Sequence, residues 1–421
     1  MKAIQQIFGG NLRQYGMGAA LILLLLFFQW RTNGVMLTPT NAQNILNGNS
    51  YVLILAVGML FVIITGQIDL APGSVAAVVG ICVALSIQNW GFPWWAGVLF
   101  GLAIGIAIGC WQGSWLAFVG VPGFITTLAG QMLFRGLALY IGKAASVPVP
   151  KEIRYIGNGF LPEWGPSTGL NNSTLLLGIV AYVAIVLGEV RRRRRVIRAN
   201  GTPVPLWAMV TRLVVMAVVL GYLTYLFGSG RYGTSFPVTG LILVVLVLLY
   251  NFIATRTTIG RGVYAVGGNR AAAALTGINT KKVYFLAMAN MSFLAAVAAI
   301  MFIGRSTSTG PGDGIGWELD AIAAVFIGGA AVSGGVGTVV GALIGGLVMA
   351  VLNNGMYLIG VSSDKSQIIR GLVLLVAVAF DLYNKTQGRS SITGALLRGL
   401  RIKGRGEAKE AERPRAEVTQ S

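Results

Sequence analysis

The sequence has no histidine, only two cysteines and few charged residues, and each scarcity excludes a class of protein. Cys82 and Cys110 both lie in apolar runs, so we expect no metal site, no haem ligand and no disulfide framework. Only 11% of the 421 residues are charged. Soluble domains carry about 25%, so this chain has too little polar surface for a soluble fold of its size. An enzyme embedded in the membrane is also disfavoured, because the sequence shows no recognisable nucleophile with its base.

Apolar residues dominate the chain instead, in runs long enough to cross a bilayer. They make up 55% of the sequence, and runs of about twenty residues recur, which is the length that a membrane-spanning helix needs. Lipid cannot satisfy backbone polar groups, so such runs must be helical. The sequence therefore predicts an all-α polytopic membrane protein, a bundle of about 10–12 transmembrane helices. The candidate spans are about 14–30, 48–66, 70–89, 94–118, 121–142, 174–190, 206–228, 236–254, 283–304, 318–333, 338–356 and 367–383.

Glycine interrupts the pair of runs at 318–356, which could include a re-entrant or half-spanning element and so lower the number of full spans. The run that follows Arg13 has no convincing cleavage site, so we expect it to be the first membrane helix and not a removed signal peptide.

Basic residues indicate the orientation. The net charge is +19, but the basic residues cluster in a few loops and the tail, as the positive-inside rule predicts, with anionic membrane lipid as a second contributor. They do not form a groove-binding surface, so nucleic acid is not an expected partner. The arginine run 191–195 and the segment 255–282 are predicted to be cytoplasmic. This places the loop 143–173 outside and both termini inside.

The C-terminal region from 385 to 421 differs from the rest of the chain. It is polar, mixed in charge and without an apolar face, so we expect a basic cytoplasmic tail that is disordered or lies on the membrane surface. Residues 1–384 then form the transmembrane domain.

Two features concern contacts between the predicted spans. Gly101, Gly105, Gly109 and Gly113 form a stripe at four-residue spacing, which favours close helix packing over a direct role in transport. Arg135 lies inside a span and needs a partner that the sequence does not identify.

Three acidic residues lie next to apolar runs. A carboxylate at mid-bilayer costs about 2.5–3.5 kcal/mol, so each must face a polar interior or an interface. Asp69, near Gly66 and Gly73, either caps the third helix, lies in a pathway or holds a break between helices. For Glu318 and Asp320, at the start of the tenth run, helix capping is the favoured role. The candidates for a translocation pathway or gate are Gly66, Asp69, Gly73, Glu318 and Asp320.

The most informative segment is 255–282, TRTTIGRGVYAVGGNRAAAALTGINTKK. Asn269 is a good N-cap, an alanine-rich run follows, and Gly277 is a typical C′ residue. This pattern predicts a capped helix roughly 10 Å long. Isolated helices this short are marginal in water, so this one must dock, either against its own bundle or into a cytoplasmic partner.

Motifs for nucleotide binding are missing. The phosphate-binding loop has the pattern GxxxxGK followed by serine or threonine. Gly142 and Lys143 do not complete this pattern, because the preceding Gly136 is one residue too far away and Ala144 stands in place of the serine or threonine. The glycine-rich stretch 333–341 connects two membrane runs and not a strand to a helix. Any dependence on ATP must therefore come from a separate chain, and we expect no cofactor in this one.

Three blocks carry a resemblance to a known family. The stretch GRGVYAVGGNRAAAALTGINTKKV, the stretch VIITGQIDLAPGSVAAVVG at 62–80 and ELDAIAAVFIGGAAVSGGVGTVVGALIGG at 318–346 resemble segments of the ribose/xylose/arabinose-type ABC sugar permeases. Extra length around 143–235 resembles the xylose-type members. Gln67, Ala71 and Pro72 differ from the residues that are usual in this family at these positions. The difference affects the expected local backbone shape and not the resemblance to the family.

The resemblance implies a permease subunit that moves a monosaccharide, xylose or a related sugar, across the bacterial inner membrane and does no chemistry itself. It implies a homodimer, two copies of an ATPase subunit that bind ATP and Mg, and a periplasmic sugar-binding protein. It also implies that the segment 255–282 couples to the ATPase. The expected coupling residues are Arg261, Gly267, Gly268, Asn269, Arg270, Ala272, Leu275, Thr276, Gly277 and Ile278.

Two alternative functions remain open, one from the residues and one from the family resemblance. An ion-coupled secondary transporter of small polar solutes would use Asp69, Glu318 or Asp320 as its ion site, but these charges form no obvious relay. A branched-chain amino acid ABC permease is the runner-up within the same class.

Overall fold

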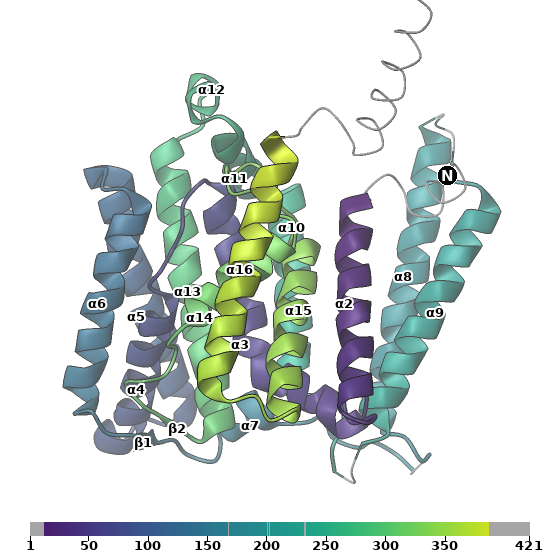
Figure 1. The fold of residues 1–421 in the computed structure, drawn as a ribbon, viewed down its shortest axis with the longest axis horizontal. Coiled ribbons are helices and arrows are strands. Elements are labelled where there is room, and N and C mark those ends of the chain that lie inside the picture. Colours follow the sequence, from purple (N-terminus) through teal and green to yellow (C-terminus); the bar gives the residue numbers. More distant parts are fainter. Residues whose placement is uncertain (1–11, 167, 200, 202, 231–232, 387–421) are drawn as a thin grey trace, which may run out of the picture. The chain divides into compact units, whose positions relative to one another are not determined.

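The computed structural model describes residues 12–166, 168–199, 201, 203–230 and 233–386, and the regular structure of these residues is almost all helix (Figure 1). The elements in chain order are α2 (Leu12–Arg31), α3 (Pro39–Ile64), α4 (Pro72–Trp90), α5 (Trp94–Ser114), the π-helix η1 (Trp115–Val119), α6 (Gly123–Gly142), β1 (Val147–Pro148), α7 (Arg154–Asn158), α8 (Asn172–Arg198), α9 (Leu206–Gly228), α10 (Val238–Arg256), α11 (Thr258–Gly268), α12 (Arg270–Leu275), α13 (Thr280–Ser306), β2 (Ser308–Thr309), α14 (Trp317–Ile327), α15 (Val339–Leu358) and α16 (Ser363–Thr386). The chain divides into two compact units, Met1–Ala377 and Val378–Ser421. Most of the predicted tail lies outside the described residues.

Nine helices in the described part of the chain are long and apolar enough to cross a membrane. They are α3, α4, α5 with η1, α6, α8, α9, α10, α13 and α15, and α2 adds a shorter apolar helix, Gly16–Arg31. The predicted all-α polytopic fold is confirmed. The run at 318–333 is not a full span, because α14 has only 11 residues and ends at Ile327. The half-spanning alternative is therefore the correct one.

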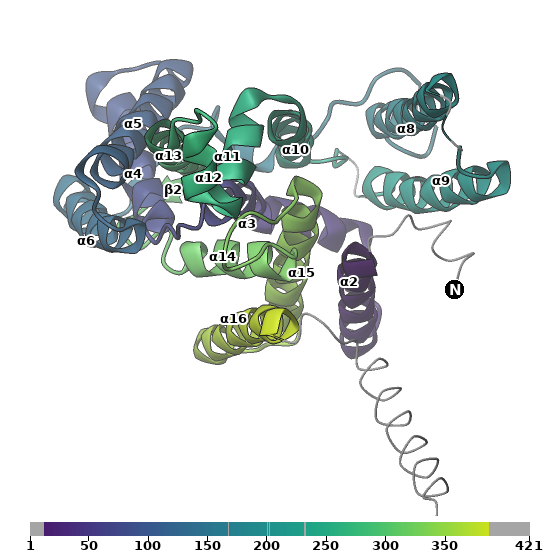
Figure 2. The same ribbon diagram turned by 90° about the horizontal axis from the view of Figure 1, so that it is seen from above.

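Two helices form the centre of the larger unit. α13 packs against α3, α4 and α5, while α3 also packs against α14 and α15 (Figures 1 and 2). In the most apolar window of α3, 89% of the residues are buried inside the protein, against 11% in α8 and 6% in α9. A helix that is apolar on all sides belongs either in a core or against lipid. α3 lies in the core of the bundle, and we infer that the hairpin α8–α9 lies against lipid.

The glycine stripe of α5 packs closely against another helix, as the sequence predicts, and the structure shows that this helix is α13. A Cβ added at Gly105 would lie 2.5 Å from the Cβ of Ala296, and one added at Gly109 would lie 2.7 Å from the Cα of Ala289. Small residues on both helices thus let the two backbones approach each other.

The arginine run is part of a helix and not of a loop, contrary to the prediction of a span ending near residue 190. α8 continues through the run to Arg198, because arginine is a good helix former. Arg193 donates to the carbonyl of Val204, and Arg212 on α9 forms an ion pair with Glu189 at 3.6 Å. Arg193 of the run thus contacts the connection between α8 and α9, and Glu189, which precedes the run, joins the two helices through Arg212.

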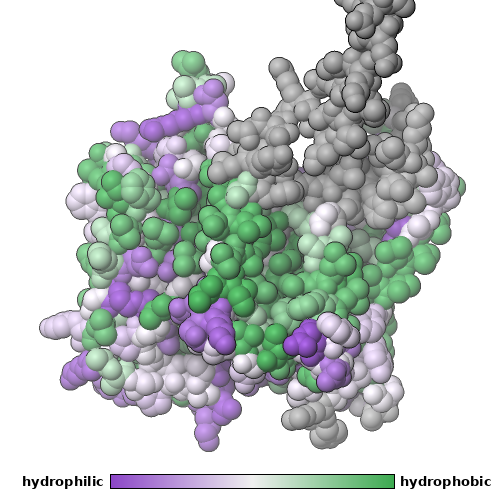
Figure 3. All heavy atoms as spheres, viewed as in Figure 1, coloured by the Kyte–Doolittle hydropathy of each residue, from purple (hydrophilic) through white to green (hydrophobic). Residues whose placement is uncertain are grey.

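The two short strands join the connections at one end of the larger unit. β1 pairs antiparallel with β2, with Val147 opposite Thr309 and Pro148 opposite Ser308. α12 lies at the opposite end, which is called the α12 end from here on (Figure 1). Figure 3 shows apolar residues over much of the middle of one face, with hydrophilic residues gathered toward both ends, as a membrane-spanning unit requires.

Candidate functional site

The chain is interrupted between α3 and α4, and Asp69 stabilises this break. Asp69 is 1% exposed, and its Oδ1 accepts from the backbone N–H of Ala71 at 2.8 Å. Gly66 turns the chain with a φ of +80°, and Thr127 on α6 donates from its hydroxyl to the carbonyl of Ile68 at 3.3 Å. Ala71, the N-cap of α4, makes no side-chain cap. The hydrogen bond to Ala71 fits one of the roles that the sequence left open for Asp69, holding the break between the helices. A role of Asp69 in a pathway stays a prediction.

A second break precedes α14, and the two breaks touch each other. A Cβ added at Gly73, in the first turn of α4, would lie 1.9 Å from the carbonyl oxygen of Gly314, and one added at Gly314 would lie 2.1 Å from the carbonyl oxygen of Gly73. Two helix N-termini thus meet backbone to backbone inside the bundle. Half-helix ends of this kind, buried in the protein, are typical of binding sites in transporters.

Glu318 in α14 faces α6, where two polar residues lie one turn apart. The Nε2 of Gln131 donates to Oε1 of Glu318 at 3.2 Å. Arg135 donates through Nη1 to the carbonyl of Pro311 and, at 2.6 Å, to the carbonyl of Asp313. The partner that Arg135 needs is therefore the backbone of the second break. Gln131 and Arg135 are half-buried, so this polar cluster lies at the edge of the bundle and not in its centre.

Asp320 points to a different part of the bundle. Its Oδ2 accepts from Nη1 of Arg370 on α16 at 3.1 Å and from Nδ2 of Asn353 on α15 at 3.4 Å. Residues two apart on a helix do not face the same way, so Asp320 and Glu318 separate. Both carboxylates lie in the first turn of α14, as the predicted capping role requires, and the Glu318 carboxylate accepts from the backbone N–H of Gly316. Each carboxylate also has a donor on a neighbouring helix.

Of the predicted pathway residues, the structure brings Gly73 and Glu318 into contact, whereas Asp320 has other neighbours. Gly66 and Asp69 lie in the first break, and a Cβ added at Gly73 would lie 2.6 Å from Oε2 of Glu318. Sequence reasoning missed Gln131, because a single glutamine in an apolar run carries no periodic signal. Among the described residues, no group of three or more histidines, cysteines or acidic residues could hold a metal ion.

The predicted short helix is present as α12 and projects from the bundle (Figure 1). The Oδ1 of Asn269 accepts from the backbone N–H of Ala272 at 3.0 Å, so Asn269 is the N-cap. Thr276 is the C-cap, and Gly277 ends the helix with a φ of +85°. Leu275 is 89% exposed, so this large apolar side chain is barely covered by the described residues.

The other predicted coupling residues hold α12 in place or remain on the surface. Arg270 and Gly268 are exposed, and the Arg270 guanidinium lies over the ring of Tyr284, 5.3 Å from its centroid. Ile278 packs against the cluster that contains the buried Ala273. Arg261 is exposed. One side of α12 thus docks on α13, while the other faces outward.

The helix α11, which the sequence did not predict, connects α12 to the first break. Its N-cap is Thr257, whose hydroxyl accepts from the N–H of Gly260 at 3.2 Å. At its far end a Cβ on Gly267 would lie 1.7 Å from the carbonyl oxygen of Ile64, to which the N–H of Gly335 donates at 2.8 Å. The glycines of this segment lower helix propensity. The threonine cap was the signal that could have identified it.

Comparisons with known proteins agree with this layout. Residues 41–378 match the family model described as the permease component of the branched-chain amino acid transport system. The xylose transport system permease protein of Haemophilus influenzae is 37% identical over 313 residues, 74% of this chain and 80% of that protein. Its Escherichia coli K12 counterpart is 38% identical, covering 74% and 77%. The ribose import permease protein of H. influenzae is 33% identical over 303 residues, 72% of each chain.

These relatives are named as permeases of transport systems and not as enzymes. No solved structure matches the chain. The family model matches most of the chain, and the relatives are more than 30% identical to it. The chain therefore belongs to this permease family, the one described as the permease component of the branched-chain amino acid transport system.

Proposed function

We propose that this chain is the membrane-spanning permease subunit of an ATP-binding cassette importer for xylose or a related monosaccharide. The names of the xylose and ribose permeases support the solute class. The observation that carries the proposal is α12, a capped helix with Leu275 89% exposed, joined through α11 to the end of α3. A helix that projects its apolar side chain outward fits a surface that receives a partner.

The proposed assembly has this chain as a homodimer in the bacterial inner membrane, with both termini in the cytoplasm. Two copies of an ATPase subunit, which bind ATP and Mg, dock at the α12 end, and a periplasmic sugar-binding protein delivers the solute at the opposite end. The placement of Lys and Arg supports this orientation.

In the proposed mechanism, movement of the docked ATPase is transmitted to α12 and then through α11 to the carbonyl of Ile64 and the loop at Gly335. These contacts lie beside the first break, whose other end meets the second break at Gly73 and Gly314. A shift of α11 therefore changes the position of two helix N-termini inside the bundle. Helix packing of this kind has discrete arrangements, as alternating access requires.

The first test measures energy coupling in proteoliposomes that contain the permease, its ATPase and its sugar-binding protein. Uptake of labelled xylose should stop when the ATPase is inactivated and should survive a protonophore. The opposite pattern would support the ion-coupled alternative. Labelled ribose and labelled branched-chain amino acids, each with the same binding protein, test the solute class.

The second test concerns docking alone. Leu275→Glu should reduce co-purification of the ATPase, while Ile197→Glu, at a half-exposed position on α8, should not. Because Leu275 is almost fully exposed, the substitution should leave the membrane-spanning part intact, which a melting curve in detergent verifies. Normal co-purification with Leu275→Glu would exclude α12 as the docking element.

A further inference from the structure

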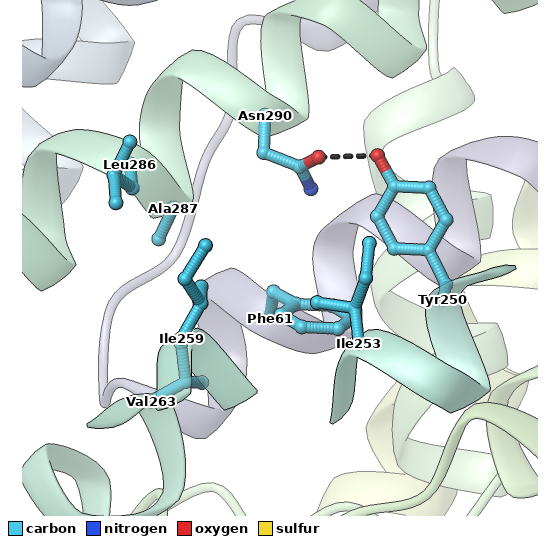
Figure 4. Close-up of a pocket in the computed structure, with 8 residues that line it drawn as sticks. All are labelled: Phe61, Tyr250, Ile253, Ile259, Val263, Leu286, Ala287 and Asn290. Atoms are coloured by element: carbon cyan, nitrogen blue, oxygen red, sulfur yellow. Dashed lines mark hydrogen bonds between the residues drawn. The ribbon is translucent and has the colours of Figure 1, made fainter. Parts of the chain in front are cut away.

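A pocket opens between four helices near the α12 end (Figure 4). Its volume is about 160 Å³, and it is partly open to the outside. Phe61 from α3, Ile253 from α10, Ile259 from α11 and Leu286 from α13 line it with hydrocarbon. The pocket therefore suits an apolar chain. It also lies beside α11, the helix that connects α12 to the rest of the bundle.

One polar pair lies within this apolar lining. The hydroxyl of Tyr250 donates to Oδ1 of Asn290, as the dashed line in Figure 4 marks. The Nδ2 of Asn290 is buried and has no hydrogen-bond partner among the described residues. A buried donor without an acceptor is costly, so an acceptor oxygen on a bound molecule would relieve a cost that the protein now carries.

Basic side chains lie one helical turn beyond the pocket, toward the α12 end. Arg256 follows Ile253 on α10, and Lys282 precedes Leu286 on α13, each at a spacing that keeps the two residues on the same face. Arg261 on α11 donates through Nη1 to the carbonyl of Arg256 at 3.5 Å. The segment 255–282 contains no acidic residue. Within the part of the chain that the structure describes, none of these three basic side chains forms an ion pair.

We propose that this pocket binds an anionic phospholipid, with one acyl chain inside it and the phosphate at Arg256 and Lys282. Asn290 would donate to an oxygen of the ester region. The apolar lining needs a hydrocarbon chain, which neither inorganic phosphate nor a nucleotide provides. The basic rim needs an anion, which a neutral lipid does not provide. The surface beside the pocket faces lipid, since Phe252 and Leu249 on α10 are 58% and 48% exposed.

Binding there has a consequence for α11. The lipid would fill the space between α11 and the helices α3, α10 and α13, so its loss would leave the segment that carries α12 less firmly held. Anionic lipid would thus support the coupling segment from the membrane side.

The test is native mass spectrometry of the full-length protein, purified in detergent, with phosphatidylglycerol and phosphatidylcholine as probes. The wild type should retain phosphatidylglycerol in preference to phosphatidylcholine. Arg256→Gln with Lys282→Gln should weaken retention about 30-fold, at about 1 kcal/mol for each basic residue. The matched control is Arg192→Gln with Arg195→Gln, which removes the same charge from exposed positions on α8 and should retain the lipid.

A second variant tests the apolar part of the site. Ile259→Trp fills the pocket from a residue that is half exposed, so the fold should tolerate it, and it should release phosphatidylglycerol. Inorganic phosphate should not displace the lipid. Equal retention by the wild type and the Arg256/Lys282 double variant would overturn the proposal. Equal loss from the α8 control would also overturn it, because attraction would then depend only on net charge.

Discussion

The contact between the two breaks makes a specific prediction for Gly73→Ala. The added Cβ would lie 1.9 Å from the carbonyl oxygen of Gly314, 2.6 Å from Oε2 of Glu318 and 2.9 Å from the carbonyl carbon of Gly314. Real Cβ contacts are essentially never shorter than 3.0 Å. A side chain could rotate away, but the Gly314 carbonyl is backbone, so the start of α4 and the second break must separate by about 1 Å.

The expected cost is about 3 kcal/mol, the upper end of the range for overpacking, because backbone has to move. This loss should lower the melting temperature by about 3–4 °C, given an unfolding entropy of about 2.1 cal/mol/K for each of the 421 residues. The assay follows tryptophan fluorescence of the detergent-purified protein during heating. Uptake in proteoliposomes should fall as well, since Glu318 and the two helix N-termini shift together.

Gly136→Ala is the matched control on α6. A Cβ at Gly136 has no heavy atom within 4 Å, so replacing this helical glycine should stabilise the protein by about 0.5–1 kcal/mol. The two glycine-to-alanine changes thus have opposite expected signs. If Gly73→Ala melts with the wild type or with the Gly136→Ala control, the reasoning about the backbone contact is refuted.

Three further predictions concern the polar contacts. Asp320→Ala leaves Arg370 without its carboxylate and should cost about 3 kcal/mol. This is the lower end of the range for a broken buried pair, because Arg370 is a quarter exposed. Asp320→Asn should cost less in the same melting assay, and equal losses would contradict this prediction. Asn269→Ala removes the N-cap of α12, a loss of about 1 kcal/mol, and should weaken ATPase co-purification, whereas unchanged capture would separate the cap from docking. Gln131→Leu removes the side-chain donor to Glu318 and should cost about 1.5–3 kcal/mol. A double-mutant cycle with Glu318→Gln that shows no coupling would exclude this contact.

Signals carried by neighbouring residues predicted much of the fold. Run length predicted most of the membrane helices, and four-residue glycine spacing predicted that α5 packs closely against another helix. The α12 helix was predicted almost to the residue, because its N-cap Asn269 and its terminating Gly277 act within one turn. The same local reasoning missed α11, where repeated glycines lower helix propensity although packing against α3 and α13 stabilises it.

The sequence by itself thus determined that the chain spans a membrane, that it contains a short capped helix and that several charged residues lie inside or beside apolar runs. Only the tertiary structure decided which partner each buried charge takes. Glu318 meets Gln131 across 187 positions of the chain, and Asp320 meets Arg370 across 50. Two carboxylates two residues apart, alike in their local surroundings, serve different contacts because a helix turns them toward different neighbours. Which neighbours these are depends on how the whole bundle packs.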